Sequence, residues 1–180
     1  MTLKAVKARI YPDQEQKQKI IDNFGYCRYV WNQLLDMQQQ RYKNGGKYVN
    51  EFGMNYLIKS LKQEHPFLKQ AESTSLLHVS RDLHHAYQKL FKEHKGHPKF
   101  KSRKFPKQSY QSNSVNGNIN QVDNSHLKLP KVGFVRFKSG RKVTGKIKNV
   151  TIYLSSTGKY YAMVLVDTEI KELPLSLIHI

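Results

Sequence analysis

The spacing of apolar residues changes twice along the chain, from strand-like to helical and back to strand-like. This succession of patterns limits the possible folds more than any other feature. Residues 3–11 alternate, placing Val6, Ala8 and Ile10 on one face, as in a half-buried strand. Apolar residues then recur at helical spacing up to about residue 95, and strand-like runs return after residue 125. An isolated strand leaves its ladder unpaired, so we expect the first strand to pair with the C-terminal strands. The sequence therefore predicts an α+β fold, a small antiparallel β-barrel or curled sheet with an inserted helical bundle.

Local signals set the expected elements. Asp13 with Gln16 forms a capping-box pattern at the start of the first helical stretch. Gly25 interrupts that stretch, and its cost of about 1 kcal/mol inside a helix favours two shorter helices meeting there. Further helices are expected over 51–64 and 73–95. Strands are expected over 132–138, 146–154 and 160–166, the last two joined by a turn containing Gly158.

The charge balance points to a polyanionic partner. The chain has 31 Lys and Arg against 13 Asp and Glu, a formal charge of +18. Between residues 94 and 166 the only acid is Asp123. No apolar run is long enough to span a membrane, and Met1–Ala5 does not resemble a secretory signal. We therefore expect a cytoplasmic protein that binds nucleic acid, with neither a membrane nor a small-molecule substrate as its partner.

A polar stretch, residues 96–125, is rich in Lys, Ser, Asn and Gln, and we expect it to be loop with at most a short strand. Phe100 and Phe105 alternate with lysines there, and Phe91 precedes them. Two roles are open for these rings: stacking on unpaired bases, or forming a small core beneath a charged loop. Arg28 and Asn32, four residues apart on a helix, also leave two roles open. They can contact phosphates and base edges, or they can form an internal polar bracket.

Catalytic and metal-binding patterns are weak. The acids are scattered over the helical stretch, and no strand presents paired carboxylates of the kind that a two-metal nuclease needs. His94 and His97 have no cysteine partner, so no metal site and no cofactor are expected. Cys27, the only cysteine, falls on an apolar helix face and is expected to be buried and inert.

Six short motifs, in order along the chain, resemble the transposon-encoded TnpB (OrfB) family. They are Arg9-x-Tyr11-Pro12, Gly25-x-x-Arg28-x-x-x-Asn32, Ala86-Tyr87-x-x-Leu90-Phe91, Gly96-His97-Pro98-Lys99-Phe100-Lys101, Leu127-Lys128-Leu129-Pro130-Lys131-Val132-Gly133 and Gly145-Lys146-Ile147-Lys148-Asn149-Val150-Thr151-Ile152. The likeness runs from about Lys4 to Pro174. Its specificity lies in the order of the motifs.

The resemblance implies an RNA-guided DNA endonuclease, of which this chain carries the N-terminal part. Residues 1–12 and 96–174 would form an oligonucleotide-binding-like wedge barrel, and 13–95 the helical recognition domain. The implied partners are a guide RNA and a double-stranded DNA target with a short transposon-adjacent motif. Phe52, Tyr56, Val115 and Asn116 would lie near that motif. The family's RuvC-like nuclease and zinc-finger domains are not expected in this chain, and residues 175–180 form an apolar tail of doubtful origin.

The residues that we expect to bind nucleic acid are Arg28, Asn32, Phe52, Tyr56, Arg81, Lys95, Lys99, Lys101, Arg103, Lys104, Lys107, Tyr110, Asn116, Lys128, Lys131, Lys146 and Lys148. Two rival functions remain. One is a stand-alone transcriptional regulator that uses helices hinged at Gly25 as a helix-turn-helix. The other is a non-specific RNA-binding protein, recognisable by a steep salt dependence without sequence preference.

Overall fold

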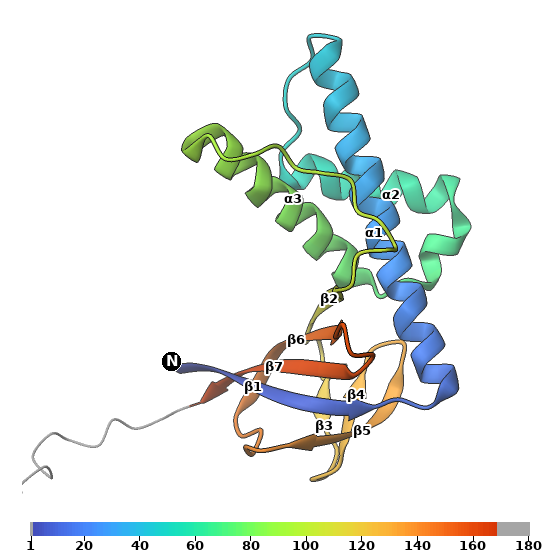
Figure 1. Cartoon of the computed structure of the whole chain (residues 1–180), viewed down its shortest axis with the longest axis vertical. Coiled ribbons are helices and arrows are strands. Elements are labelled where there is room, and N and C mark those ends of the chain that lie inside the picture. The colour runs from blue at the N-terminus through green and yellow to red at the C-terminus, as the bar shows by residue number, and fades with distance from the viewer. Residues whose placement is uncertain (1, 169–180) are drawn as a thin grey trace, which may run out of the picture.

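The computed structural model describes residues 2–168, so the 175–180 tail lies outside the described residues. The fold is α+β: helices stand at one end of a curled sheet (Figure 1). The helices are α1 (Gln14–Lys43), α2 (Glu51–Glu64), the 3₁₀-helix η1 (Pro66–Gln70) and α3 (Ser73–Glu93). The strands are β1 (Thr2–Tyr11), β2 (Gln108–Asn113), β3 (Asn120–Gln121), β4 (His126–Leu129), β5 (Gly133–Ser139), β6 (Lys146–Leu154) and β7 (Tyr160–Thr168).

The first strand, β1, has a neighbouring strand on each side in the sheet, as expected from its alternating pattern. The strand order is β2-β6-β7-β1-β5-β4-β3, and each neighbouring pair is antiparallel. The predicted pairing of β1 with C-terminal strands is confirmed, because β1 pairs with both β7 and β5. Within the described chain, the edge strands β2 and β3 do not pair with each other, so the sheet is an open half-barrel.

The first helix corrects one expectation. Its capping box is present, with Asp13 accepting from the backbone N–H of Gln16 and the Gln16 side chain accepting from that of Asp13. The helix then runs unbroken through Gly25, so the two helices expected to meet there are one. Phe24 and Cys27, on either side of the glycine, are buried. Their burial outweighs the local propensity cost of about 1 kcal/mol.

The strands predicted over 146–154 and 160–166 are confirmed, as is the one over 132–138 with a shift of one residue. The polar stretch contains more structure than predicted, because β2 has six residues and pairs with β6 along its whole length. Its inward side chains, Tyr110 and Ser112, are buried. Since the outward residues of β2 are also polar, hydrophobic alternation could not reveal this strand.

One hydrophobic cluster joins the inner face of the sheet to the helices. At their junction, Asn23 on α1 donates from Nδ2 to the Ser75 hydroxyl of α3 at 3.1 Å and accepts from the Glu72 N–H at 2.9 Å. These buried bonds fix how the first and third helices sit on each other. Among the described helices, none is long and apolar enough to cross a membrane.

Candidate nucleic-acid interface

A basic loop, residues 94–107, runs from the end of α3 across α1 before it enters β2 (Figure 1). Two side chains of α1 hold its backbone. Trp31 donates from Nε1 to the Lys99 carbonyl at 2.9 Å, and Asn32 bonds both the N–H and the carbonyl of Lys101, at 2.8 and 3.0 Å. The loop is therefore positioned by the fold itself.

Lys101 strengthens this attachment. Its Nζ lies 3.9 Å from the centre of the Trp31 ring, a cation–π contact. Although much of the Lys101 side chain is exposed, desolvation around the ammonium lowers its pKa, and the charge of Asp82 opposes this shift. With its ammonium over the indole and partly desolvated, Lys101 fastens the loop and is less available to phosphate than its neighbours.

The other cations of the basic loop face solvent. Lys99, Arg103, Lys104 and Lys107 are exposed, and within residues 2–168 none of the four forms an ion pair. Lys95 is also exposed but is paired with Glu93 at 2.6 Å. A loop that presents unpaired cations from a fixed backbone suits phosphate contact.

Between the basic loop and the helices lies a cavity of about 830 Å³. Phe100 and Phe105, 53% and 63% exposed, stand at its loop side, so the proposal of a small core beneath the loop does not hold for these two rings. His78 and Asp82 of α3 line the cavity as well. Five cationic side chains line it against one carboxylate, that of Asp82; the cations are Arg28, Lys99, Lys101, Lys104 and Lys107.

Arg28 and Asn32 act as a bracket between helix and loop. Asn32 uses its whole amide on Lys101. Arg28 donates from Nη1 to Gln108 Oε1 at 3.1 Å, and Gln108 in turn donates to the Arg103 carbonyl at 3.0 Å. Arg28 also lines the cavity, so it combines this structural role with access to a ligand.

Tyr110 differs from the sequence-based expectation. It is 5% exposed and packs edge-to-face on Phe24, with ring centres 5.6 Å apart. Burial raises the pKa of its hydroxyl strongly. Tyr110 therefore supports the walls of the cavity and does not stand out from the loop as a stacking ring.

Four of the predicted residues lie away from the basic loop, on α2, on α3 and in the turn after β2. On α2, Phe52 and Tyr56 are 81% and 70% exposed, one turn apart, and Arg81 approaches the same helix through an ion pair with Glu51 at 3.4 Å. Asn116 lies in the exposed turn after β2, with a left-handed φ of 51°. The structure does not bring these residues into the cavity beside the basic loop.

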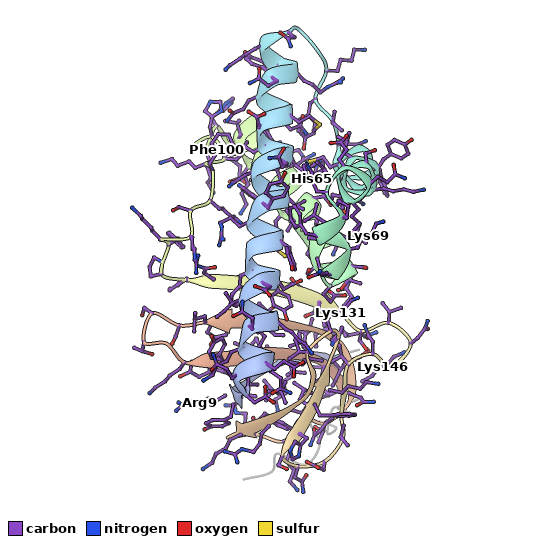
Figure 2. All side chains as sticks on the ribbon, turned by 90° about the vertical axis from the view of Figure 1, so that its right-hand side faces the viewer. Arg9, His65, Lys69, Phe100, Lys131 and Lys146 are labelled. Carbon is purple, nitrogen blue, oxygen red and sulfur yellow. The ribbon has the colours of Figure 1, made fainter. Side chains whose placement is uncertain are left out.

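The predicted lysines of the sheet lie elsewhere. Figure 2 shows Lys131 and Lys146 on the opposite side of the molecule from Phe100. Lys128 is half-buried on β4, and Lys148 pairs with Asp167 at 3.7 Å. The cations that looked like one group in the sequence thus occupy two sides of the fold.

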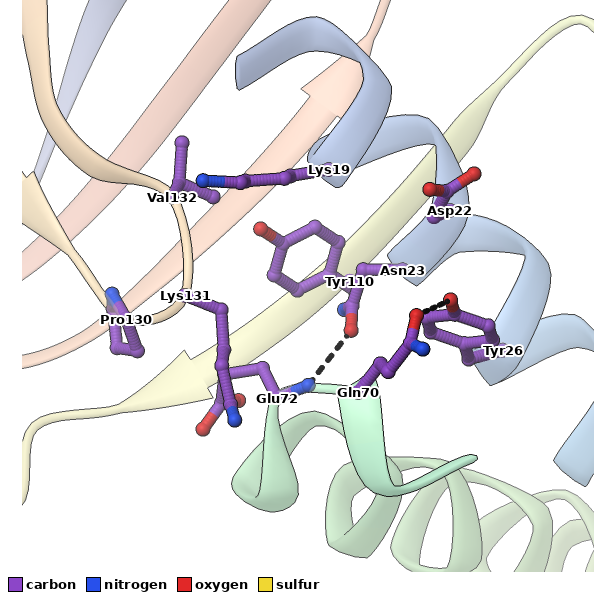
Figure 3. A pocket seen from close by; sticks show the side chains of 10 residues that line it. All are labelled: Lys19, Asp22, Asn23, Tyr26, Gln70, Glu72, Tyr110, Pro130, Lys131 and Val132. Atoms are coloured by element: carbon purple, nitrogen blue, oxygen red, sulfur yellow. Dashed lines mark hydrogen bonds between the residues drawn. The ribbon is translucent and has the colours of Figure 1, made fainter. Parts of the chain in front are cut away.

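Lys131 borders a second cavity, of about 270 Å³, between α1, η1 and the turn before β5 (Figure 3). Lys19, which the sequence analysis did not single out, also lines it but pairs with Glu15 at 2.8 Å. Asn23 and Glu72, bonded to each other, form part of the wall. Its mixed charge makes it a weaker candidate for phosphate binding than the cavity beside the basic loop.

The histidines and the cysteine of the helices, which are residue types that can bind metals or act as nucleophiles, have structural roles. His84 Nδ1 lies 2.9 Å from the Tyr48 hydroxyl, and His78 Nε2 lies 2.7 Å from Asn113 Oδ1. Cys27 is buried as predicted, and burial raises the pKa of its thiol to about 12. A thiol held in its neutral form is a poor nucleophile.

Sequence reasoning missed a set of cation–aromatic contacts on the outer face of the sheet. Lys7 lies over the ring of Tyr161 at 4.5 Å, and Arg9 over that of Tyr11 at 5.1 Å. Period-two alternation showed that Lys7, Arg9 and Tyr11 share a face. Their partners on other strands depend on register, which the sequence does not reveal.

Comparison with known proteins identifies relatives. The OrfB/IS605 family model, described as a helix-turn-helix domain, matches residues 1–47, which here comprise β1, α1 and the turn after α1. A protein of Escherichia coli strain K12, named as an RNA-guided DNA endonuclease, InsQ, is 31% identical over 170 residues, 93% of this chain. Another from Streptomyces pristinaespiralis, also named as an RNA-guided DNA endonuclease, is 28% identical over 103 residues, 56% of this chain.

The matches cover 41% of the first relative and 26% of the second, so the chain corresponds to less than half of either. Two independent kinds of match agree with the six ordered motifs. The chain is therefore similar over most of its length to part of proteins named as RNA-guided DNA endonucleases, and its residues 1–47 match the helix-turn-helix domain model of the OrfB/IS605 family.

Proposed function

We propose that this chain is the nucleic-acid-binding module of a TnpB-like protein, which grips a guide RNA scaffold and reads a short transposon-adjacent DNA motif. The observation that carries the proposal is the basic loop, whose exposed cations Lys99, Arg103, Lys104 and Lys107 stand on a backbone fixed to α1. A preset backbone lowers the entropy lost on binding. The names of both relatives, RNA-guided DNA endonucleases, support RNA and DNA as the partners.

In this proposal, residues 1–12 and 96–174, of which the structure describes 2–12 and 96–168, belong to an oligonucleotide-binding-like wedge domain, and 13–95 form an inserted recognition domain. The pairing of β1 with β5 and β7 supports the division, because it joins the two ends of the chain in one sheet. We assign binding, and not cleavage, to this segment, since its charged side chains are arranged for contact with phosphates.

We infer that DNA-motif reading falls to α2. Phe52 and Tyr56 are largely exposed although they are aromatic, and Arg81 pairs with Glu51, the first residue of the same helix. Exposed aromatic and arginine side chains are typical of surfaces that bind a partner. Asn116 would contribute from the turn after β2.

The rival regulator cannot use a hinge at Gly25, because α1 is continuous there. Tight binding of duplex DNA without RNA is the result that would favour this rival. The second rival, a non-specific RNA-binding protein, would bind RNA without sequence preference. Its affinity for RNAs of different sequence therefore distinguishes it from the proposed module.

The test compares binding of labelled RNA to the natural chain and to a loop variant, Lys99→Gln/Arg103→Gln/Lys104→Gln/Lys107→Gln. Each lost phosphate contact reduces the slope of log affinity against log salt by about 0.7 on a single strand. We expect the slope to fall by about 3 at most, with an unchanged melting midpoint. A matched control removes four exposed lysines outside the loop: Lys43→Gln/Lys47→Gln/Lys59→Gln/Lys69→Gln. Equal losses in both variants would show that net charge alone, and not the basic loop, binds the RNA.

A further inference from the structure

A row of side chains crosses the outer face of the sheet over four strands. Tyr153 of β6 lies opposite Tyr161 of β7, Tyr161 opposite Arg9 of β1, and Arg9 opposite Lys138 of β5. The residues next to them along each strand, such as Ile152, point into the core. Antiparallel register therefore gathers two rings and two cations, far apart in sequence, on one solvent-facing line.

The rings of this row contact one another and their neighbouring cations. Tyr153 and Tyr161 are stacked, with ring centres 5.2 Å apart and planes at 18°. Lys7 Nζ lies 4.5 Å from the centre of Tyr161. Stacked rings with an ammonium above them present a preset flat surface, because few rotamers remain open to them.

A second group continues the row toward β5. Two guanidinium groups contact the ring of Tyr11, with Arg9 Cζ at 5.1 Å and Arg136 Cζ at 5.4 Å from its centre. Arg136 is the cross-strand partner of Tyr11. Guanidinium planes, like aromatic rings, can stack on nucleobases.

The charged side chains that lie near the row on this face are all basic. On β1, β5, β6 and β7, the acid among the outward-facing residues is Asp167, which lies at the far end of β7 opposite Leu3 and pairs with Lys148. Lys7, Arg9, Arg136 and Lys138 carry no ion pair within residues 2–168. Such a face is complementary to phosphates.

The row is continuous with the cavity beside the basic loop. Thr151, two residues before Tyr153 and on the same face of β6, lines that cavity together with Gln111 of β2. In the view of Figure 2, Arg9 and Phe100 both lie to the left of α1, Arg9 at the sheet and Phe100 beside the helices. A nucleic-acid strand bound at the basic loop can thus continue onto the outer face of the sheet.

We propose that this outer face binds an unpaired segment of RNA. Unpaired bases extend the Tyr153–Tyr161 stack and the group around Tyr11, while Lys7 and Lys138 contact phosphates. Aromatic side chains on a sheet bind single strands, because the bases of a duplex are already stacked on each other. The inference rests on the proposed function, in which the chain carries a folded RNA that offers unpaired loops.

The test measures fluorescence anisotropy of the full chain with a labelled 12-nucleotide oligo(U), an RNA duplex of 12 base pairs and oligo(dT) of the same length. The variant is Tyr153→Leu/Tyr161→Leu, and the control is Tyr42→Leu, a tyrosine 84% exposed at the far end of α1. We expect the double variant to bind oligo(U) at least about tenfold more weakly, with duplex affinity changed less than about twofold. The control variant is expected to bind as the natural chain does.

An unchanged affinity for oligo(U), or equal losses on single strand and duplex, would overturn the proposal, as would tighter binding of oligo(dT) than of oligo(U). A second variant, Lys7→Gln/Lys138→Gln, leaves the rings in place and is expected to lower the salt slope on oligo(U) by about 1.4. If the basic-loop variant loses RNA while both sheet variants retain it, the proposed function stands and the outer-face site falls.

Discussion

Asn32 on α1 and Lys101 in the basic loop, 69 residues apart, are joined by two hydrogen bonds between one side-chain amide and one backbone unit. Asn32 Nδ2 donates to the Lys101 carbonyl at 3.0 Å, and the Lys101 N–H donates to Asn32 Oδ1 at 2.8 Å. With the Trp31 indole bonded to Lys99, this pair decides where the cations of the loop stand. Most of the expected behaviour of the loop follows from this attachment.

Asn32→Ala should release the loop. Two hydrogen bonds are lost at a partly exposed position, so we expect a decrease of about 1 kcal/mol in the free energy of unfolding. Trypsin should cleave faster between Lys99 and Lys107. The control is Gln33→Ala, an exposed neighbour on the same helix. Equal digestion rates in the two variants would contradict the attachment.

Lys101→Gln and Lys104→Gln remove the same charge from the same loop but should differ in effect. Lys101 lies over Trp31, so its loss should cost about 0.5–1 kcal/mol of stability. Lys104 makes no such contact and should instead lower the salt slope of RNA binding. Chemical denaturation and salt titration of both variants measure this. The reverse pattern would show that Lys101 contacts phosphate.

Gly25→Ala should stabilise the chain, because α1 is helical at this position. A Cβ there would meet only the Arg28 guanidinium, at an ordinary 3.7 Å. Helix propensity predicts a gain of about 1 kcal/mol in the free energy of unfolding. A lower melting midpoint for the variant would indicate that α1 bends at Gly25 after all.

Gly145→Ala should do the opposite. Gly145 has φ of 111°, and a Cβ would clash with the Asp167 carbonyl oxygen across the β6–β7 pair. We expect a loss of more than about 1 kcal/mol. Gly140→Ala, where a Cβ meets nothing within 4 Å, is the matched control. Thermal unfolding of the two variants is the measurement, and equal midpoints would refute the close approach.

Features set by neighbouring residues could be predicted from the sequence. The capping box at Asp13 and the strand over 146–154 are examples, because each depends on residues within a few positions of one another. The continuity of α1 at Gly25 could not be predicted. Burial of Phe24 and Cys27 against distant elements decided it, and a local propensity scale does not contain that contribution.

The candidate site likewise has some features that could be predicted from the sequence and others that could not. The basic character of residues 94–107 was evident in the sequence. That Asn32 would hold Lys101, and that Tyr161 would lie between Tyr153 and Arg9, depended on tertiary contact and strand register. Tyr110 was predicted to contact nucleic acid because its segment is polar, yet β2 turns it into the core.

The most direct measurement of guided binding is to purify the chain from the organism that encodes it and to sequence the RNA that accompanies it. We predict one enriched transcript from the adjacent transposon end, and its depletion in the basic-loop variant. Bulk RNA without enrichment, or no RNA at all, would contradict guided binding by this chain.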